Sequence, residues 1–370
     1  MAVTRYIVIR FTVENKKTKD SKPILYGSIL VVQDFKALYS GTITDVHAHI
    51  YPKNYLKELG KRTQYPVFRT NSEGTSFIQF SDTSRSFPVT DSFFDLDYRI
   101  KEMDKFKVAT ELLSSINPWT DVFPNAELAV QFSKLINNEI SNIVSKYKNE
   151  RRFLGLATLP LLSPIDAKKE LERAVDELGL AGAILGTNVN GTYLSDERFL
   201  PIFEVAQRKK CLLFIHPTIP LGVDRLRDYG LVRSLGYVFD STVNLVKMAY
   251  AGVFDKFPEL KLISAHLSGA IPYLQGRIDV AWKMFPESKG NLSEPPTSKI
   301  RKALHADTIS YSRGALRLAS EFIGVERLMF GSDFPFEWGT ENAKKSVEEA
   351  FDDNELRLIY SENFDRATKS

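Results

Sequence analysis

Short apolar runs alternate with longer amphipathic segments along most of this chain. From residue 41 onward eight apolar runs stand out: 42–49, 108–116, 153–159, 181–187, 211–216, 261–266, 303–309 and 327–333. Most are apolar at consecutive positions, as in parallel strands that are buried on both faces. The segments between them place apolar residues three and four positions apart, which is typical of helices that bury one face. The pattern therefore predicts eight β–α units.

This number of alternations favours a closed barrel over an open, doubly wound sheet. The units occupy about 330 residues, which suits one barrel with insertions, and no glycine-rich dinucleotide fingerprint argues for the open form. The stretch 51–98 is rich in proline, serine, threonine and aromatic residues and separates the first two strands. We therefore predict an α/β fold, a (β/α)8 TIM barrel with a long loop insertion after strand 1.

The first 40 residues have a different pattern. The alternating stretches RYIVIRFTV and PILYGSILVV are separated by the polar run ENKKTKDSK. This arrangement is typical of a β-hairpin. We expect two regions: a short N-terminal β extension at 1–40 and the barrel at 41–370.

Composition and charge narrow the class of protein. The 49 basic and 46 acidic residues give a net charge of +3 and are interspersed along the chain, which does not indicate a nucleic-acid binder. The single cysteine, Cys211, agrees with a reducing compartment. No apolar window reaches the ~20 residues of a spanning helix, and the first residues lack a signal-peptide cleavage site. We expect a cytoplasmic protein that binds neither nucleic acid nor membrane.

Four of the five histidines fall at the carboxyl ends of predicted strands. His47 and His49 end the first strand, His216 the fifth and His266 the sixth. In a parallel barrel these ends open onto one face, where residues far apart in sequence converge. Because His47 and His49 are two positions apart on one strand, both side chains point the same way. Asp333, after the eighth strand, should lie beside them.

These residues predict a metal site. We assign His47, His49, His216 and Asp333 as the ligands of a divalent ion, and this donor set suits Zn²⁺, with Mn²⁺, Co²⁺ or Fe²⁺ as alternatives. The fourth strand, AGAILGTN, lacks the lysine that bridges two ions in related barrels, so we expect one ion. Such an ion polarises substrate oxygens and activates water. We expect His266 to act as the general base and Asp333 to take part in catalysis by bridging the metal and the proton transfer.

Several of these positions have a structural alternative. Asp333 alone could cap a helix, because a glycine and a proline make its segment a turn. We expect His305, in the middle of the seventh strand, to be structural. Asp307 could orient His266 or a helix end, or could cap the sheet. Cys211 begins an apolar strand and is expected to be a core residue rather than a nucleophile.

With these residues in place, the chain resembles the amidohydrolase superfamily, in the branch of the aminocarboxymuconate semialdehyde, resorcylate and salicylate-type decarboxylases. The similarity spans residues 41–366 and rests on motifs in the family's order, among them DVHAHIYP, YRIKEMDKFKV, GVFDKFPELKLISAH, PPTSKIRKALHADT and LMFGSDFPF. The resemblance implies a mononuclear metal enzyme whose ligands match His47, His49, His216 and Asp333. It also implies that His266 is the catalytic acid-base residue and that the protein is a homodimer.

The pocket departs from the family's pattern in two ways. Leu267-Ser268-Gly269 replaces a glycine-rich run after the catalytic histidine, which implies a bulkier wall. Phe87 stands where the aminocarboxymuconate enzyme has an arginine that binds a substrate carboxylate. We expect the insertion 51–98 to form part of the substrate pocket, since it must emerge on the catalytic face. Its aromatic wall would be built from Tyr51, Phe87, Phe93 and Phe94.

The family's cationic substrate contacts are also altered. Arg85 lies two residues before Phe87, and Phe285 replaces a second arginine that the partner subunit supplies in the aminocarboxymuconate enzyme. The loss of both cations disfavours a dianionic substrate, which would lack bidentate partners. We name Arg85, Phe87 and Arg277, which belongs to the matching Gly-Arg pair, as candidate substrate-binding residues.

The resemblance implies a non-oxidative decarboxylase of a small unsaturated or aromatic carboxylate. The alternative is a metal-dependent hydrolase of an ester, lactone or amide, because the same ion can polarise a carbonyl group. A catalytically silent barrel would predict a gap in the ligand set, and the sequence has none.

Overall fold

The computed structural model describes residues 7–10, 28–31, 42–82, 86–117, 119–289, 292–336 and 339–369. By its internal contacts the chain divides into two compact units, residues 1–40 and 41–370. In the first unit, β1 (Ile7–Arg10) pairs antiparallel with β2 (Ser28–Val31). This pairing joins the two stretches in which apolar and polar residues alternate.

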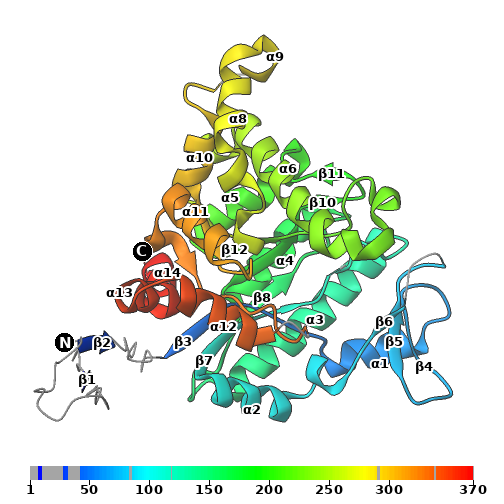
Figure 1. Cartoon of the computed structure of the whole chain (residues 1–370). Coiled ribbons are helices and arrows are strands. Elements are labelled where there is room, and N and C mark those ends of the chain that lie inside the picture. Colours follow the sequence, from blue (N-terminus) through cyan, green and yellow to red (C-terminus); the bar gives the residue numbers. More distant parts are fainter. Residues whose placement is uncertain are drawn as a thin grey trace, which may run out of the picture. The chain divides into compact units, whose positions relative to one another are not determined.

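Eight parallel strands form the main sheet of the second unit (Figure 1). Their order is β15-β14-β13-β12-β9-β8-β7-β3, so strands that follow one another along the chain are neighbours in the sheet. Their bounds are β3 Ile43–Ile50, β7 Val108–Ser115, β8 Phe153–Thr158, β9 Gly182–Gly186, β12 Leu212–His216, β13 Lys261–Ser264, β14 Leu304–Asp307 and β15 Leu328–Met329. Every strand falls within one residue of its apolar run, which confirms the predicted (β/α)8 TIM barrel.

The first and last strands of the barrel meet at a short seam. Backbone hydrogen bonds cross it from Val46 to Phe330 (2.9 Å), from His49 to Phe334 (2.7 Å) and from Asp333 to His47 (2.9 Å). An isolated parallel bridge joins Ala48 to Phe334. The seam therefore brings the His-x-His pair of β3 next to the aspartate that follows β15.

Helices lie around the strands of the barrel (Figure 1). Their bounds are α1 Lys53–Lys61, α2 Leu96–Phe106, α3 Ala126–Lys146, α4 Pro164–Asp176, α5 Leu200–Lys209, α6 Tyr237–Tyr250, α7 Val253–Lys256, α8 Ile271–Met284, α9 Pro286–Lys289, α10 Pro296–Ala303, α11 Arg313–Ile323, α12 Gly339–Ala350, α13 Asp353–Arg357 and α14 Asn363–Lys369. Side-chain caps mark several starts: Asp95 accepts a hydrogen bond from the backbone of Tyr98, and Asn125 from that of Leu128. Within the described ranges, no helix combines the length and apolar character that a membrane span requires.

The core of the barrel is apolar and closely packed. One cluster of buried side chains joins seven strands and the last helix, with Val46, Leu112, Leu156, Ile184, Phe214, Ile263, Met329 and Phe364 among its members. Gly182 allows β9 to approach β12, since a Cβ atom there would lie 1.8 Å from the carbonyl oxygen of Leu212. The packed interior gives the strand ends fixed positions on the face that carries the histidines.

The segment 51–98 has more regular structure than the long loop that the sequence predicted. Besides α1, it forms an antiparallel sheet of β4 (Val67–Thr70), β5 (Ser76–Gln79) and β6 (Phe87–Pro88). Asn71 makes the turn between β4 and β5, because its side-chain oxygen accepts the backbone N–H groups of Glu73 and Thr75. A second short hairpin, β10 (Asn188–Val189) and β11 (Thr192–Tyr193), follows β9.

Candidate metal centre

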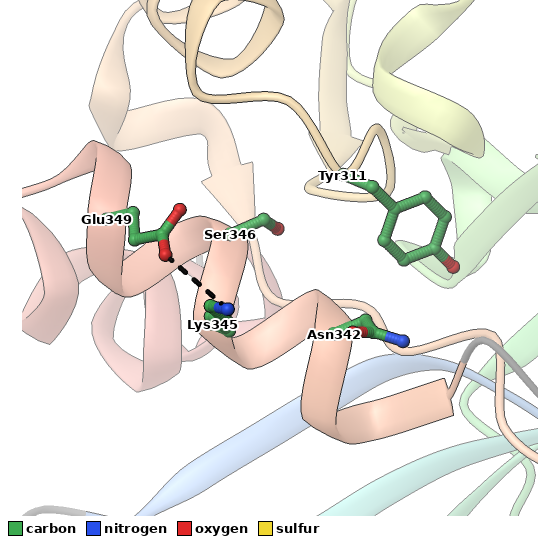
Figure 2. A pocket seen from close by; sticks show the side chains of 5 residues that line it. All are labelled: Tyr311, Asn342, Lys345, Ser346 and Glu349. Atoms are coloured by element: carbon green, nitrogen blue, oxygen red, sulfur yellow. Dashed lines mark ion pairs between the residues drawn. The ribbon is translucent and has the colours of Figure 1, made fainter.

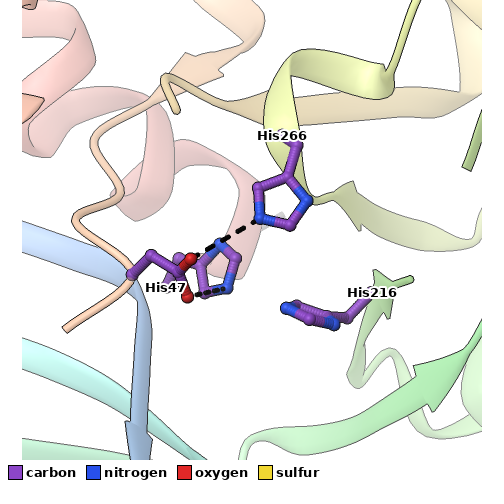
Figure 3. A group of neighbouring side chains, drawn as sticks. His47, His216 and His266 are labelled. Atoms are coloured by element: carbon purple, nitrogen blue, oxygen red, sulfur yellow. Dashed lines mark ion pairs between the residues drawn. The ribbon is translucent and has the colours of Figure 1, made fainter. Parts of the chain in front are cut away.

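The predicted site residues converge from four strands. His47 and His49 lie on β3, His216 ends β12, His266 follows β13 and Asp333 follows β15. The side chains of His47, His49, His216 and Asp333 are buried, and that of His266 is 13% exposed. Figure 3 shows the rings of His47, His216 and His266 facing one another across a small space. The structure thus brings together all five residues named as ligands or acid-base group.

The ligand atoms of this cluster lie close enough to share one ion. The Nε2 atoms of His47 and His49 are 2.9 Å apart, and each is 3.2 Å from Oδ1 of Asp333. Ligand atoms of His47, His216, His266 and Asp333 all lie within 4.8 Å of one another. The ring of His216 stands 5.0 Å from the rings of both His47 and His49, centre to centre.

The other nitrogen of each predicted ligand histidine is held by the protein. His47 Nδ1 donates to Oδ2 of Asp307 at 2.6 Å, His49 Nδ1 lies 2.8 Å from Oγ of Ser114, and His216 Nδ1 lies 2.7 Å from the carbonyl of Pro217. A hydrogen bond from Nδ1 fixes the tautomer in which Nε2 carries the lone pair. The donor set therefore fits a divalent metal ion, and a single ion accounts for it.

The electrostatics of the metal-free cluster depend on burial and on two carboxylates. At His47 the carboxylates of Asp333 and Asp307 outweigh burial and raise the pKa to about 10. Burial lowers the pKa of His49 to about 4 and, with the nearby His47 charge, that of His216 well below its usual range. Burial opposes the charge on Asp333, but the facing histidines hold its pKa well below the usual range. These shifts favour a charged His47, neutral His49 and His216, and an ionised Asp333 when no ion is bound.

His266 faces the second carboxylate oxygen of Asp333. Its Nε2 lies 3.7 Å from Oδ2 of Asp333, whereas His47 and His49 face Oδ1. Among the described residues, its Nδ1 has no hydrogen-bond partner. Asp333 therefore contacts both the histidines predicted as ligands and His266.

The backbone at His266 has an uncommon conformation. The φ angles of His266, Leu267, Ser268 and Gly269 are 53°, 57°, 63° and 69°, a left-handed turn of four consecutive residues. Each residue with a side chain costs roughly 1 kcal/mol or more in this region, and glycine adopts it freely. Leu267 and Ser268 are buried. Where the family has glycines, this chain therefore has two buried residues whose backbone conformation is costly.

The sequence did not reveal the charged network beneath the site. Arg99 of α2 is completely buried, donates to Glu111 at 2.8 Å and to the carbonyl of His49, and lies 4.6 Å from the ring centre of Phe334. Asp45 accepts hydrogen bonds from the backbone of His47 and from Ser332. Because these residues lie on either side of the seam, the network links the strand ends that carry the predicted ligands.

Aromatic side chains border the histidines. The ring of Phe336 lies 6.1 Å from that of His49 and contacts Phe87 at 6.1 Å and Phe93 at 5.8 Å. Tyr51 packs against Phe87 and Phe93, and Trp119 lies 5.7 Å from His216. Phe87 thus belongs to a chain of ring contacts that reaches His49, one of the predicted ligands.

The other two candidate substrate residues are Arg85 and Arg277. Arg85 lies outside the described residues. Arg277 is exposed on α8, and none of the contacts of the metal cluster involves it. His305 is likewise absent from the cluster, and burial lowers its pKa to about 4.

A cavity of about 330 Å³ opens between α12 and the loop after β14 (Figure 2). Its lining residues are Tyr311, Asn342, Lys345, Ser346 and Glu349. Burial raises the pKa of Tyr311, and the carboxylates of Asp333, Asp307 and Asp45 raise it further. Tyr311 therefore lies within electrostatic range of the carboxylates of the site.

A closed parallel barrel with imidazoles and a carboxylate at the carboxyl ends of its strands defines a metal-dependent barrel enzyme. The family model for amidohydrolases matches residues 44–364 of this chain. The chain belongs to the amidohydrolase family.

Several proteins similar to this chain are decarboxylases. The chain is 29% identical over 297 residues to the 2-amino-3-carboxymuconate-6-semialdehyde decarboxylase of Dictyostelium discoideum, covering 80% of this chain and 82% of that protein. The structure matches the IDCase of Metarhizium anisopliae in its apo form with a TM-score of 0.79 and 28% identity, over 89% of this chain and 97% of that one. It matches the dihydroxybenzoic acid decarboxylase of Polaromonas sp. JS666, solved with bound manganese, with a TM-score of 0.73 and 22% identity, over 89% and 97% of the chains. The sequence relatives favour the predicted decarboxylase over the alternative hydrolase.

Proposed function

We propose that this chain is a metal-dependent, non-oxidative decarboxylase of a small aromatic or unsaturated carboxylate. The observation that carries the proposal is the divided environment of Asp333, whose two oxygens face the ligand histidines and His266 respectively. A decarboxylase needs both a site that holds the substrate's oxygens and a proton donor beside the carbon that loses CO2. This geometry supplies both from adjacent strand ends.

In the proposed site, His47, His49, His216 and Asp333 hold one divalent ion. When bound, such an ion polarises the oxygens of a chelating substrate. As the carbon–carbon bond breaks, CO2 leaves without the bonding electron pair, which stays on the substrate carbon. His266 moves the proton that this carbon takes up, and Asp333 holds His266 in place through Oδ2.

The metal is proposed from the donor set. Three imidazoles and one carboxylate suit Zn²⁺, and Mn²⁺, which the Polaromonas decarboxylase carries, is the second candidate. Elemental analysis of purified protein tests this choice. Zinc or manganese at about one ion per chain agrees with the proposal, and two ions per chain would contradict the single site.

The substrate class is proposed from the walls of the site. Phe87, Phe93 and Phe336 make an apolar wall near His49, which suits an aromatic ring better than a second carboxylate. We propose Phe87 as a substrate contact and keep Arg85 and Arg277 as candidates. Phe87→Arg should raise the preference for a dicarboxylate over a monocarboxylate, and an unchanged preference would remove Phe87 from the pocket.

We further propose a cytoplasmic homodimer. Large apolar side chains are exposed on two neighbouring parts of the barrel, with Phe239 on α6 and Tyr273, Val280 and Met284 on α8. Exposed apolar groups of this kind are typical of surfaces that bind another chain. Light scattering after gel filtration should give about twice the 42.0 kDa of one chain.

A substrate panel tests the reaction. Metal-loaded protein is incubated with aromatic and unsaturated carboxylates, and released CO2 is measured. Parallel reactions with esters, lactones and amides measure hydrolysis. CO2 release that disappears on metal removal and returns on reloading agrees with a decarboxylase. Metal-dependent hydrolysis without CO2 release from any carboxylate would instead select the hydrolase.

A further inference from the structure

One buried carboxylate contacts both halves of the site. Asp307 ends β14 and is completely buried. Its Oδ2 accepts the hydrogen bond from Nδ1 of His47 at 2.6 Å. Its Oδ1 accepts the backbone N–H of Leu267 at 3.1 Å and that of Ile309 at 3.0 Å. Asp307 is therefore bonded at one oxygen to a proposed metal ligand and at the other to the turn that carries His266.

That turn depends on its partners. His266, Leu267 and Ser268 occupy a conformation that side chains disfavour, so contacts must hold them there. The backbone N–H of Leu267 bonds to Asp307, and the N–H of Ala270 donates to Oγ1 of Thr242 at 2.8 Å. Asp307 and Thr242 thus fix the two ends of the turn, and of these two Asp307 is bonded to a proposed metal ligand.

The sequence left open whether Asp307 orients His266 or caps the sheet. In the structure it bonds the ring of His47 and the backbone beside His266. An ion on Nε2 of His47 would fix the orientation of that ring and, through the hydrogen bond from Nδ1, the position of the Asp307 carboxylate. A carboxylate fixed in this way would restrict the movement of the Leu267 backbone that is bonded to its other oxygen.

We infer that Asp307 is a positioning residue that couples metal binding to the left-handed turn of His266. This inference rests on the proposed metal site. Because coupling free energies are reciprocal, an ordered turn strengthens metal binding as much as the metal orders the turn. His266 would then be held beside Asp333 chiefly when the ion is bound.

Hydrogen exchange of the unaltered protein tests the coupling directly. Exchange of the peptide that covers residues 265–270 is followed by mass spectrometry with and without saturating Zn²⁺. We expect Zn²⁺ to slow exchange at Leu267 by about 10-fold. The hairpin turn at 71–75 serves as an internal control and should not change. Equal exchange at Leu267 with and without bound Zn²⁺ would overturn the inference.

Variants of Asp307 and Thr242 separate the functions of these two residues. Asp307→Asn keeps one oxygen for the backbone amides but presents an amide group to His47. It should weaken Zn²⁺ binding by about 10- to 100-fold, and Zn²⁺ at saturation should no longer slow exchange at Leu267. Thr242→Val removes the hydroxyl that holds the other end of the turn and leaves the carboxylate of Asp307 in place. Zn²⁺ should therefore still slow hydrogen exchange at Leu267 in this variant. Thr242→Ser, which keeps the hydroxyl, should behave like the unaltered protein.

A matched control removes a carboxylate elsewhere. Asp279 accepts the backbone N–H and the hydroxyl of Thr297 at 3.3 and 2.6 Å, far along α8 from the histidines. Asp279→Asn should bind Zn²⁺ as tightly as the unaltered protein. If Asp307→Asn also binds Zn²⁺ normally, or if Zn²⁺ still slows hydrogen exchange at Leu267 in that variant, Asp307 does not couple metal binding to the turn of His266.

These readouts do not depend on turnover. A protein that binds Zn²⁺ but releases no CO2 from any carboxylate would refute the proposed reaction and leave this inference standing. A protein that releases CO2 while Leu267 exchanges independently of Zn²⁺ would refute the inference and leave the reaction standing.

Discussion

Replacing Arg99 by methionine should strongly destabilise the barrel. Methionine occupies a similar length of side chain but removes the guanidinium that donates to Glu111 and to the carbonyl of His49. Glu111 is buried, so its carboxylate would be left charged without a partner. It would also lie close to Asp45, whose pKa burial and then the charge of Glu111 already raise to about 7.

The magnitude follows from this geometry. Breaking a buried ion pair by removing one partner costs about 3–5 kcal/mol, because the remaining charge is stranded. Whole domains are stable by only ~5–15 kcal/mol, so Arg99→Met should lose a large share of the total. The double variant Arg99→Met/Glu111→Gln removes the stranded charge as well. It should recover ~1–3 kcal/mol relative to the single variant.

Urea denaturation followed by circular dichroism measures these differences on metal-free protein. Arg208→Met is the control, since Arg208 forms an exposed ion pair with Glu172 and should cost less than ~1 kcal/mol. Two results would refute the reasoning: an Arg99→Met variant as stable as the control, or a double variant no more stable than Arg99→Met.

Three further predictions concern the histidines. His266→Ala should keep its metal by elemental analysis, while CO2 release falls about 10²- to 10⁴-fold; loss of the metal would instead make His266 a ligand. Binding of Zn²⁺ at pH 7 should release about one proton, because the pKa of His47 is raised to about 10 and its imidazolium must deprotonate, so metal affinity rises with pH. Calorimetry in buffers of different ionisation enthalpy measures that proton, and a buffer-independent heat would exclude it. Burial lowers the pKa of His305 from 6.5 to about 4. Between these two pH values the unfolded chain binds a proton at His305 and the folded chain does not, so the free energy of unfolding decreases as pH falls from 6.5 to about 4. His305→Asn should flatten that pH dependence of the urea midpoint, and an unchanged slope would show that other groups cause it.

The strands and the clustering of the histidines could be predicted because each leaves a mark on the sequence. A strand that is buried on both faces requires consecutive apolar residues, and the runs at 153–159 and 211–216 nearly coincide with β8 and β12. The histidines could be predicted because they interrupt such runs at the carboxyl ends, where a barrel gathers them. The segment 51–98 was harder, since its short strands and polar turns resemble an irregular loop.

The supporting contacts could not be predicted, because they depend on pairing between distant segments. His47 and Asp307 are 260 positions apart, and their contact follows only from the packing of β3 near β14. Arg99 is of a residue type that is usually exposed, so nothing in its surroundings marked it as buried. At Leu267 the residue type argues against a left-handed conformation, and the contacts of the turn override that preference.

The seam between β3 and β15 also determines how late in protein synthesis the proposed metal site can form. Asp45 and Ser332, which bond across it, are 287 positions apart in the chain. A ribosome that adds roughly 5–20 residues per second would finish the second position roughly 15–60 seconds after the first. During that interval the histidines of β3 have been synthesised but their carboxylate partner has not. A premature stop codon anywhere before Asp333 would therefore remove a predicted ligand from every chain it truncates, however much of the barrel had already been made.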